Sequence, residues 1–345
     1  MAVSPTPKPT ASLTGAEAAQ PSSNPGGPGL ARWGKKWPGA IGGVVAVAYS
    51  AGADSTALLL AANERWPGQV RALHVHHGLQ AAADQFEALA RQTCTKLDIP
   101  LQVIRVDARP GPGQSPEEAA RNHRYRALAD MASSMDAGVV LLAQHADDQM
   151  ETVLLALSRG AGLPGLAAMP ERFVRHGMVF GRPLLDVSAA SLRTWLGEEG
   201  HAFIDDPSNA DLRYTRNRIR SRLVPAWEES FPGFRDRLVR SARHAAQAQS
   251  LLDELAHSDL KDVGEPPTIR GLQAMNPARQ ANVLRFWLRK AWGVSPSEAQ
   301  MDALLSQIQA CRTRGHRIEL KVADGQVLRV GDCLAYVRPD EARQI

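Results

Sequence analysis

Hydrophobic residues in the first part of the chain fall into short apolar runs separated by longer amphipathic stretches. Buried strands are predicted at the apolar runs, 44–49, 70–75, 101–106 and 139–143. Helices are predicted between and after them, at 56–65, 82–97, 116–135 and 147–159, with Gly160 and Gly162 ending the last. Strands that are apolar throughout and alternate with helices are typical of a parallel sheet covered on both faces. The pattern therefore predicts an α/β fold with a doubly wound parallel sheet.

The pattern changes after about residue 232. Helical stretches follow, at 234–256, 269–292 and 296–314. The segments 316–322 and 326–330 flank Asp324-Gly325, a hairpin signal. We therefore expect a catalytic α/β domain at 41–230 and a smaller, mostly helical C-terminal domain at 231–345 that ends in a β-hairpin.

The first 30 residues are rich in Pro with Ser, Thr and Gly between, and they contain no apolar core of the kind that a secretory signal needs. This segment is interpreted as a disordered tail outside the fold, or as the product of an upstream start codon, with residues 1–40 forming tail and lead-in. No run of 18 apolar residues occurs, which argues against a membrane span.

Charge and cysteine content narrow the class of protein. The chain has 345 residues and a net charge of +4, from 40 basic and 36 acidic side chains. The segment from Arg213 to Arg243 contains nine Arg and three acidic residues, which gives it a local net charge of +6. This segment is the best candidate for contact with a polyanion, although a solvated helical face would have the same composition. Three scattered cysteines form no disulfide framework and no C-x-x-C pair, which favours a reduced, cytoplasmic protein.

The loop after the first predicted strand has the composition of an anion-binding turn. It consists of small residues and one carboxylate, Ser50, Ala51, Gly52, Ala53, Asp54 and Ser55, and a helix follows it. Small residues let backbone N–H groups approach a phosphate at a helix N-terminus. Asp54 would repel a bare phosphate but suits a Mg²⁺ ion that bridges carboxylate and phosphate oxygens. A plain strand-to-helix turn capped by Ser and Asp explains the composition equally well.

A second polar segment follows the fourth predicted strand. It includes His145, Asp147, Asp148 and Glu151, at the edge of the sheet where ligands collect in such folds. Packing does not explain so many ionisable groups in seven residues, although acidic side chains also favour the first turn of a helix.

The motifs together resemble one family, the bacterial tRNA(Ile)-lysidine synthetases. The 50–55 loop is similar to the pyrophosphatase-type P-loop, with family pattern S-G-G-x-D-S. The other matching segments are His74 to Leu79, Glu118 to Arg121 ahead of Arg124-Tyr125, His145 to Thr152, Arg159 to Leu166, Asp205 to Asn209, and Arg216 to Pro225. The resemblance implies an adenine nucleotide α-hydrolase-like fold, with ATP and Mg²⁺ as cofactors.

The resemblance also implies a reaction and its residues. Family members use ATP and free L-lysine to convert the wobble cytidine of the isoleucine tRNA with a CAU anticodon into lysidine. The residues carried over as catalytic are Asp54, Asp148 and Arg121. ATP binding is carried over to the 50–55 loop with His74 and His145, metal binding to Asp54, and substrate binding to Asp147, Glu151, Arg216, Asn217 and Arg220. A homodimer is left open, and no membrane partner is expected.

Two positions depart from the family pattern. Ala51 replaces the first Gly of the loop, which removes backbone freedom at the point nearest to phosphate. His76 stands where many members have Asp, so we leave it out of the catalytic set.

Two competing functions remain at this stage. A tRNA thiolase of the same fold would need a sulfur-carrying cysteine or a C-x-x-C cluster site, and neither is present. An inactive tRNA-binding homologue would have no need to keep Asp54, Asp147, Asp148 and Glu151, because buried carboxylates are costly when unpaired.

Overall fold

The computed structural model describes residues 23–40, 43–76, 82–106, 116–206, 209, 211–313 and 315–338. These residues form two compact units. One contains the described residues up to Glu151 together with Met169–Val239, and the other contains Thr152–Ala168 and the described residues from Arg240 onward.

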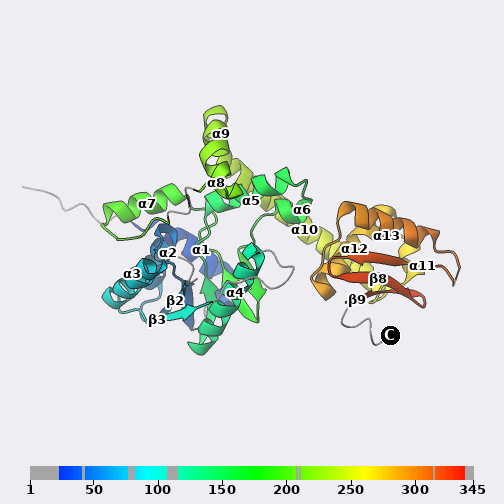
Figure 1. Ribbon diagram of the computed structural model, residues 1–345, viewed down its shortest axis with the longest axis horizontal. Helices are drawn as coiled ribbons and strands as arrows, with labels where there is room; N and C mark the ends of the chain where they lie inside the picture. The colour runs from blue at the N-terminus through cyan, green and yellow to red at the C-terminus, as the bar shows by residue number, and fades with distance from the viewer. Residues whose placement is uncertain are drawn as a thin grey trace, which may run out of the picture. The chain divides into compact units, whose positions relative to one another are not determined.

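A six-stranded sheet forms the centre of the first unit (Figure 1). Its strands are β1 (Val44–Ala48), β2 (Val70–His76), β3 (Leu101–Arg105), β4 (Ala137–Leu141), β5 (Arg172–Arg175) and β6 (Met178–Gly181), in the order β3-β2-β1-β4-β6-β5. All neighbours are parallel except β5, which pairs antiparallel with β6. The predicted parallel α/β sheet is confirmed, and the β5–β6 pair at its edge is an addition that the apolar runs did not predict.

Helices cover both faces of this sheet because alternate side chains of its central strands point in opposite directions. Val45 and Val47 of β1 pack on one face, in a core with α2 (Ala53–Arg65), α3 (Ala82–Lys96) and α7 (Ala189–Glu198). Ala46 packs on the other face, in a core with α4 (Pro116–Ser134). The remaining helix that follows a parallel strand is α5 (Ala146–Ser158), which begins after β4.

Most predicted element boundaries differ from the structure by a few residues, whereas the helix predicted at 234–256 extends to Val263. The largest difference in the first unit is at α2, which was predicted from residue 56 and begins at Ala53. Gly52 occupies the N-cap position with an extended backbone, so Asp54 and Ser55 lie in the first helical turn. Strand β4 lies two residues earlier than predicted, at Ala137–Leu141.

The N-terminal segment is part of the fold from Gly26 onward, so the prediction of a disordered tail is wrong there. Helix α1 (Gly26–Lys36) buries Leu30 and Trp33 in the core of the first unit. The Trp33 ring lies against Gly181, where an added Cβ would come within 2.4 Å of it. Composition misled the prediction because proline is tolerated in the first turn of a helix. The part of the predicted tail before residue 23 lies outside the described residues.

Five short elements complete the described part of the chain up to residue 230. They are a 3₁₀ turn at Pro38–Ala40, α6 (Leu163–Leu166), α8 (Thr215–Arg218), a π-helical turn at Ile219–Leu223, and α9 (Val224–Ser230). Helix α10 (Phe234–Val263) runs through the boundary between the units. The boundary lies at Val239 in the structure, nine residues beyond the predicted one.

The second unit combines helices with a small antiparallel sheet. Its further elements are α11 (Ile269–Gln273), α12 (Pro277–Trp292), α13 (Glu298–Ala310), β7 (Glu319–Val322), β8 (Gly325–Val330) and β9 (Cys333–Val337). The predicted helix 269–292 is two helices, because Asn276 caps the N-terminus of α12 by accepting from the Arg279 N–H. The predicted hairpin is β7–β8, and β9 extends it to a three-stranded sheet in the order β7-β8-β9.

Within the described residues, none of the helices is both long and apolar enough to cross a membrane.

Candidate functional site

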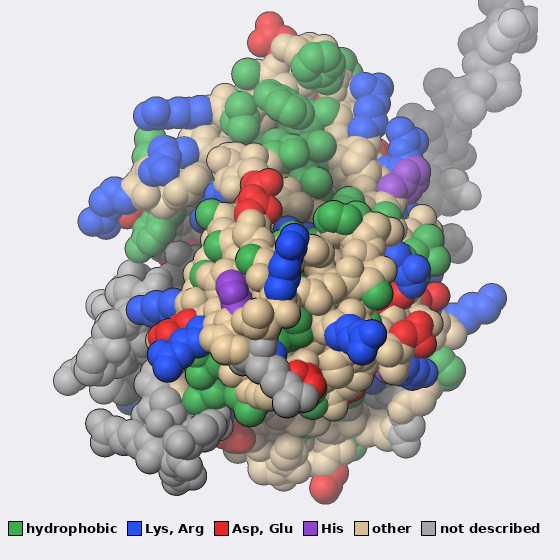
Figure 2. Space-filling view, turned by 90° about the vertical axis from the view of Figure 1, so that its right-hand side faces the viewer, with side chains coloured by type: hydrophobic (Ala, Val, Ile, Leu, Met, Phe, Trp, Pro, Cys, Tyr) green, Lys and Arg blue, Asp and Glu red, His purple; other side chains and the backbone are tan. Residues whose placement is uncertain are grey.

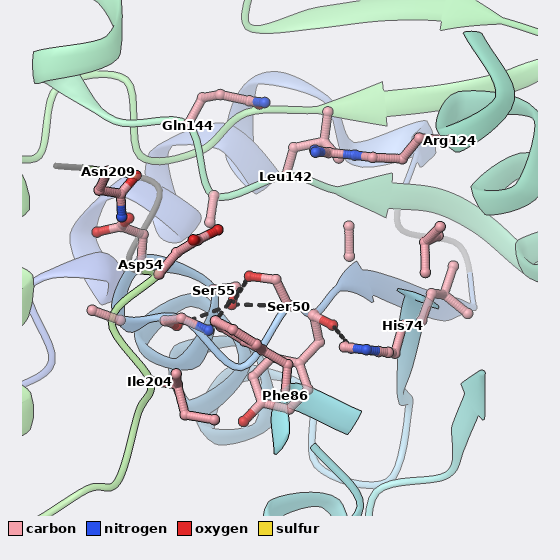
Figure 3. Close-up of a pocket in the computed structure, with 18 of the residues that line it drawn as sticks. Ser50, Asp54, Ser55, His74, Phe86, Arg124, Leu142, Gln144, Ile204 and Asn209 are labelled. Carbon is pink, nitrogen blue, oxygen red and sulfur yellow. Dashed lines mark hydrogen bonds between the residues drawn. The ribbon is translucent and has the colours of Figure 1, made fainter. Parts of the chain in front are cut away.

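A cavity of the first unit opens where the strand order of its sheet reverses. Strand β1 lies between β2 and β4, so the loops after β1 and β4 separate and leave a crevice between them. The cavity measures about 520 Å³. Residues of both loops, of β2 and of the segment from Ile204 to Asn209 line it (Figure 3).

The 50–55 loop presents the N-terminus of α2 to this cavity. The Ser55 hydroxyl lies 3.0 Å from the Ser50 hydroxyl and donates to the Gly52 carbonyl at 3.0 Å, which fixes the loop. Hydrogen bonding within α2 begins with the Thr56 N–H, which leaves the preceding amides of its first turn directed outward. Ser50, Gly52, Ala53, Asp54 and Ser55 all line the cavity, so the predicted anion cradle faces an open space of suitable size.

Ala51 is fully buried and has a φ of +64°. This left-handed conformation is unfavourable for a residue with a Cβ and explains why glycine suits the position. The Ala51 carbonyl accepts from the Ile204 N–H at 3.0 Å, and this contact holds the Ile204 segment against the loop. The loop therefore retains its shape with alanine at a cost in backbone strain.

Two histidines of β2 line the cavity, and the tautomer of one is set by its partner. His74 Nδ1 donates to the Tyr49 carbonyl at 2.8 Å, and burial lowers the pKa of His74. Its imidazole is therefore neutral, with Nε2 as an acceptor. His76, which we left out of the catalytic set, also lines the cavity and lies 3.2 Å from Asp84 through Nε2.

His145 lies among three carboxylates. Its Nε2 is 3.5 Å from both Asp54 Oδ2 and Asp148 Oδ2, and its Nδ1 is 3.7 Å from Asp147 Oδ2. Burial lowers the pKa of His145, but the interactions with Asp54, Asp148 and Asp147 outweigh it and raise the pKa above its usual value. Burial raises the pKa of Asp54, and His145 with the more distant Arg193 and Arg220 outweighs that effect and lowers it. The two side chains therefore favour each other's charged form.

Asp54 also has an oxygen that suits a cation. Its Oδ1 is buried and accepts no hydrogen bond from the residues described. A buried carboxylate oxygen without a partner is costly, and a divalent ion satisfies it. In the described parts of the chain, no group of three or more His, Cys, Asp or Glu side chains is arranged to hold a metal ion by itself. One carboxylate fits Mg²⁺ that takes its other ligands from phosphate and water, which is the usual arrangement for this ion.

Asp147 is predicted to bind substrate, but it does not line the cavity. Its Oδ2 accepts from the Ala189 N–H at 2.9 Å, at the N-terminus of α7, and its Oδ1 lies 3.1 Å from Arg235 Nε. These contacts make it a helix-capping carboxylate that joins α5 to α7.

Glu151 and the polar group of α8 and the π-helical turn do not line the cavity either. Glu151 is fully buried and forms a bidentate pair with Arg220, which also reaches Asp148 Oδ1 at 3.2 Å. Arg216 lies 3.9 Å from each of these carboxylates. Asn217 is buried and donates to the Asp211 carbonyl at 2.8 Å. Sequence reasoning treated the group as a surface for tRNA phosphates, whereas its members are held by protein partners.

Of the predicted catalytic residues, Asp54 and Asp148 line the cavity and Arg121 does not. Arg121 is exposed, and its guanidinium lies 5.6 Å from the Tyr125 ring centroid. Arg124, one helical turn further along α4, lines the cavity instead. It belongs to the same Arg-Tyr motif, and the register of the helix decides which arginine faces inward.

Several cavity residues were not assigned from the sequence. They are Phe86, Arg124, Gln144, Arg193, Ile204, Asp205, Asp206 and Asn209. Asp205, Asp206 and Asn209 belong to the 205–209 motif of the family, to which no role was assigned from the sequence. Arg193 of α7 pairs with Asp205 at 2.7 Å, a contact between segments that no local pattern connects.

Comparison with known proteins assigns the chain to a family. A PP-loop domain profile matches residues 40–227, and a TilS substrate binding domain profile matches residues 268–335. The tRNA(Ile)-lysidine synthase of Polaromonas naphthalenivorans is 61% identical over 290 residues, which cover 84% of this chain and 88% of that protein. The chain belongs to the tRNA(Ile)-lysidine synthase family. The tRNA(Ile)-lysidine synthase of Burkholderia pseudomallei is 44% identical over 275 residues, and the match covers 78% of this chain but only 56% of that protein.

A solved structure supports the fold alone. The U34-tRNA thiolase of Methanococcus maripaludis, solved with its [4Fe-4S] cluster, superposes with a TM-score of 0.50 at 15% identity, over 63% of this chain and 79% of that one. The chain thus shares its fold with that protein over this part, and a shared fold does not by itself imply a shared function.

Proposed function

We propose that this protein ligates free L-lysine to C2 of the wobble cytidine in the isoleucine tRNA with a CAU anticodon, forming lysidine. ATP is consumed, and AMP and pyrophosphate are released. Lysidine pairs with A instead of G, so the tRNA reads AUA instead of AUG and changes from methionine to isoleucine identity. The observation that carries the proposal is the cavity that joins the 50–55 loop to Asp54 and Asp148, within a chain of this family.

The first step activates the base. The C2 carbonyl oxygen of cytosine attacks the α-phosphorus of ATP, and the bond to pyrophosphate breaks. Backbone amides of the 50–55 loop and the positive end of α2 stabilise the departing charge. His74 Nε2 offers an acceptor to the nucleotide on the β2 side of the cavity. Mg²⁺ bound at Asp54 would supply further charge neutralisation on the phosphates.

The second step transfers the amine. The lysine ε-amine attacks C2, the C2–O bond breaks, and AMP leaves with that oxygen. The amine has a pKa of about 10.4 in water, so it must lose a proton to react. Asp148 lines the cavity and is the residue that we assign to binding the ammonium and accepting its proton. His145, at 3.5 Å from both Asp148 and Asp54, connects the two carboxylates.

Arg220 and Glu151 position Asp148. Arg220 bridges the two carboxylates, and Arg216 adds positive charge beside them. We keep Arg121 as a residue for the phosphates around the extruded cytidine, because it is exposed on the same helix as the cavity-lining Arg124. The reaction takes place in the cytoplasm on this account, where tRNA and ATP are available.

Cysteine placement argues against the thiolase alternative. Burial raises the pKa of the Cys94 thiol to about 12, and this residue packs in the hydrophobic core. Cys311 and Cys333 belong to the second unit and to no C-x-x-C pair. None of the three lines the cavity. The buried Oδ1 of Asp54, which accepts no hydrogen bond from the described residues, disfavours an inactive homologue. A binding module without activity would be more stable if this carboxylate were replaced.

ATP labelled at the α-phosphorus tests this proposal. Without lysine, label should enter the CAU isoleucine tRNA as the adenylated cytidine, and added lysine should release it as AMP. Asp148→Asn should accumulate the labelled tRNA and lose lysine transfer by on the order of 10²-fold, with tRNA binding nearly intact. Label that never enters the tRNA, or unchanged turnover of Asp148→Asn, would contradict the mechanism.

A further inference from the structure

Arg182, which directly follows β6, is a buried cation without an ionic partner. Its side chain is 3% exposed, and no ion pair to it occurs among the described residues. Its guanidinium stacks 4.3 Å from the Phe173 ring centroid and donates to the Pro170 carbonyl at 2.8 Å and to the Tyr125 hydroxyl at 3.4 Å. Burying a charge without a counter-ion costs free energy, so we expect the contacts of Arg182 to have a role beyond packing.

A further side-chain contact of Arg182 reaches the wall of the cavity. Its Nε donates to Gln144 Oε1 at 3.0 Å. A guanidinium has donors only, so the amide of Gln144 can turn only its oxygen toward Arg182. The amide nitrogen of Gln144 is then left for the cavity, which Gln144 lines. The Gln144 amide, which could otherwise donate or accept, can therefore only donate toward the cavity.

A second donor group lies on the same side of the cavity. Gln144 and Arg124 lie across the pocket from Ser50, Ser55 and His74 (Figure 3). Within the described parts of the chain, no carboxylate pairs with Arg124. Gln144 and Arg124 therefore both present donors to the cavity, and a group rich in acceptor oxygens is their complementary ligand.

We propose that Arg182 is a positioning residue that presents the Gln144 amide N–H groups to an acceptor oxygen at the reacting centre. This inference rests on the proposed function. The acceptor belongs either to the phosphates of ATP or to the target base of the tRNA, since both carry oxygens of this kind. A donor that is fixed before the ligand arrives needs no reorganisation as charge develops on that oxygen.

Gln144→Glu separates positioning from stability. The substituted carboxylate keeps its contact with Arg182 and gives this cation a counter-ion, so Tm should stay the same or rise. It removes both N–H donors, so kcat for lysine transfer should fall on the order of 10²-fold. Gln144→Met removes the donors without adding charge and should lose activity to a similar extent. Gln102→Glu is the matched control. The side chain of Gln102, on β3, accepts from the Ser134 hydroxyl at the end of α4 and does not line the cavity, so activity should not change.

A double-mutant cycle tests whether Arg182 acts through Gln144. Arg182→Lys keeps the charge but loses the planar fork, and it should lower kcat in the wild-type background. In the Gln144→Met background it should cause little further loss, because its target is already absent. Additive losses, or full activity of Gln144→Glu, would overturn the inference.

Two binding measurements identify the acceptor. A weaker affinity of Gln144→Met for a non-hydrolysable ATP analogue, with KM for tRNA unchanged, assigns it to the nucleotide. The reverse result assigns it to the base. Failure of the proposed function is recognised separately, because the wild-type protein would then also show no lysine transfer.

Discussion

At the scale of single residues, the sequence motifs predicted only part of the site. The motifs correctly indicated the 50–55 loop, His74 and Asp148 as residues of one crevice, because loops after parallel strands meet at one edge of the sheet. They did not indicate that Arg220 is paired with Glu151, since the two are 69 positions apart in the sequence. They also did not indicate Arg182, whose contact with Gln144 depends on tertiary packing.

Ala51→Gly should relieve the strain in the loop. A left-handed conformation costs a residue with a Cβ about 1–2 kcal/mol, and the added chain entropy of glycine offsets about 0.5–1 kcal/mol of this. We expect the free energy of unfolding to stay the same or rise by up to about 1.5 kcal/mol. Ala62→Gly, at a buried position of α2, should lower it by about 1 kcal/mol or more. Urea denaturation of both variants checks the difference, and equal destabilisation would contradict a strained Ala51.

The His145 cluster predicts a pH dependence of stability. A histidine whose pKa is raised on folding stabilises the fold below its unfolded value of about 6.5, and this contribution is lost as pH rises through the folded value. Asp54, whose pKa is lowered, contributes above about 3.9 and loses its contribution as pH falls. The pair is therefore fully effective between about pH 4 and 6.5.

His145→Gln should cost more free energy of unfolding at about pH 6 than at about pH 9, where the wild-type imidazole has lost its proton. Urea denaturation at the two pH values measures the difference. His123→Gln, at an exposed position of α4, is the control and should show no such dependence. A cost for His145→Gln that is independent of pH would show that the charged cluster is not what stabilises the site.

At the scale of elements, hydrophobic patterning predicted the alternating strands and helices of the sheet well, because each buries a continuous apolar face. Hydrophobic patterning failed to predict the elements that bury little apolar surface. Helix α1 has two large buried side chains, Leu30 and Trp33, within a sequence of Gly and Pro. Strands β5 and β6 are four residues each, and β5 at the edge of the sheet begins and ends with Arg, so their pattern is too short to recognise.

Trp33→Ala tests whether α1 belongs to the folded domain. Trp33 is buried against Gly181, and its Nε1 donates to the Glu171 carbonyl at 3.0 Å. Removing a buried tryptophan costs about 3–5 kcal/mol, and the free energy of unfolding should fall by that amount. Arg32→Ala, on the same helix, removes only an exposed ion pair to Asp186 and should cost about 1 kcal/mol or less. Equal effects of the two variants would mean that α1 adds little to the fold.

At the scale of the whole molecule, the basic segment from Arg213 to Arg243 is less available than its charge suggests. Arg213, Arg216, Arg220 and Arg235 are engaged by carboxylates of the protein. Arg222 and Arg237 are exposed, and no carboxylate partner of either occurs in the described ranges. On the face shown in Figure 2, Lys and Arg side chains are spread among apolar and acidic ones. Composition alone located the positive charge but could not separate paired from exposed arginines.

Charge reversal at Arg222 or Arg237 should weaken binding to every tRNA, whatever its nucleotide sequence. Each lost phosphate contact should lower the slope of log K against log salt concentration by about 1. Binding titrations at several salt concentrations measure this slope. Arg65→Glu, at the end of α2, makes the same charge change away from the segment and is the control. Unchanged slopes for Arg222→Glu and Arg237→Glu would place the tRNA elsewhere.

The most direct test of the central claim is transfer of radiolabelled lysine in the presence of ATP. The wild-type protein should label the isoleucine tRNA with a CAU anticodon and should not label the methionine tRNA with the same anticodon. Labelling of both tRNAs, or of neither, would contradict the assigned function.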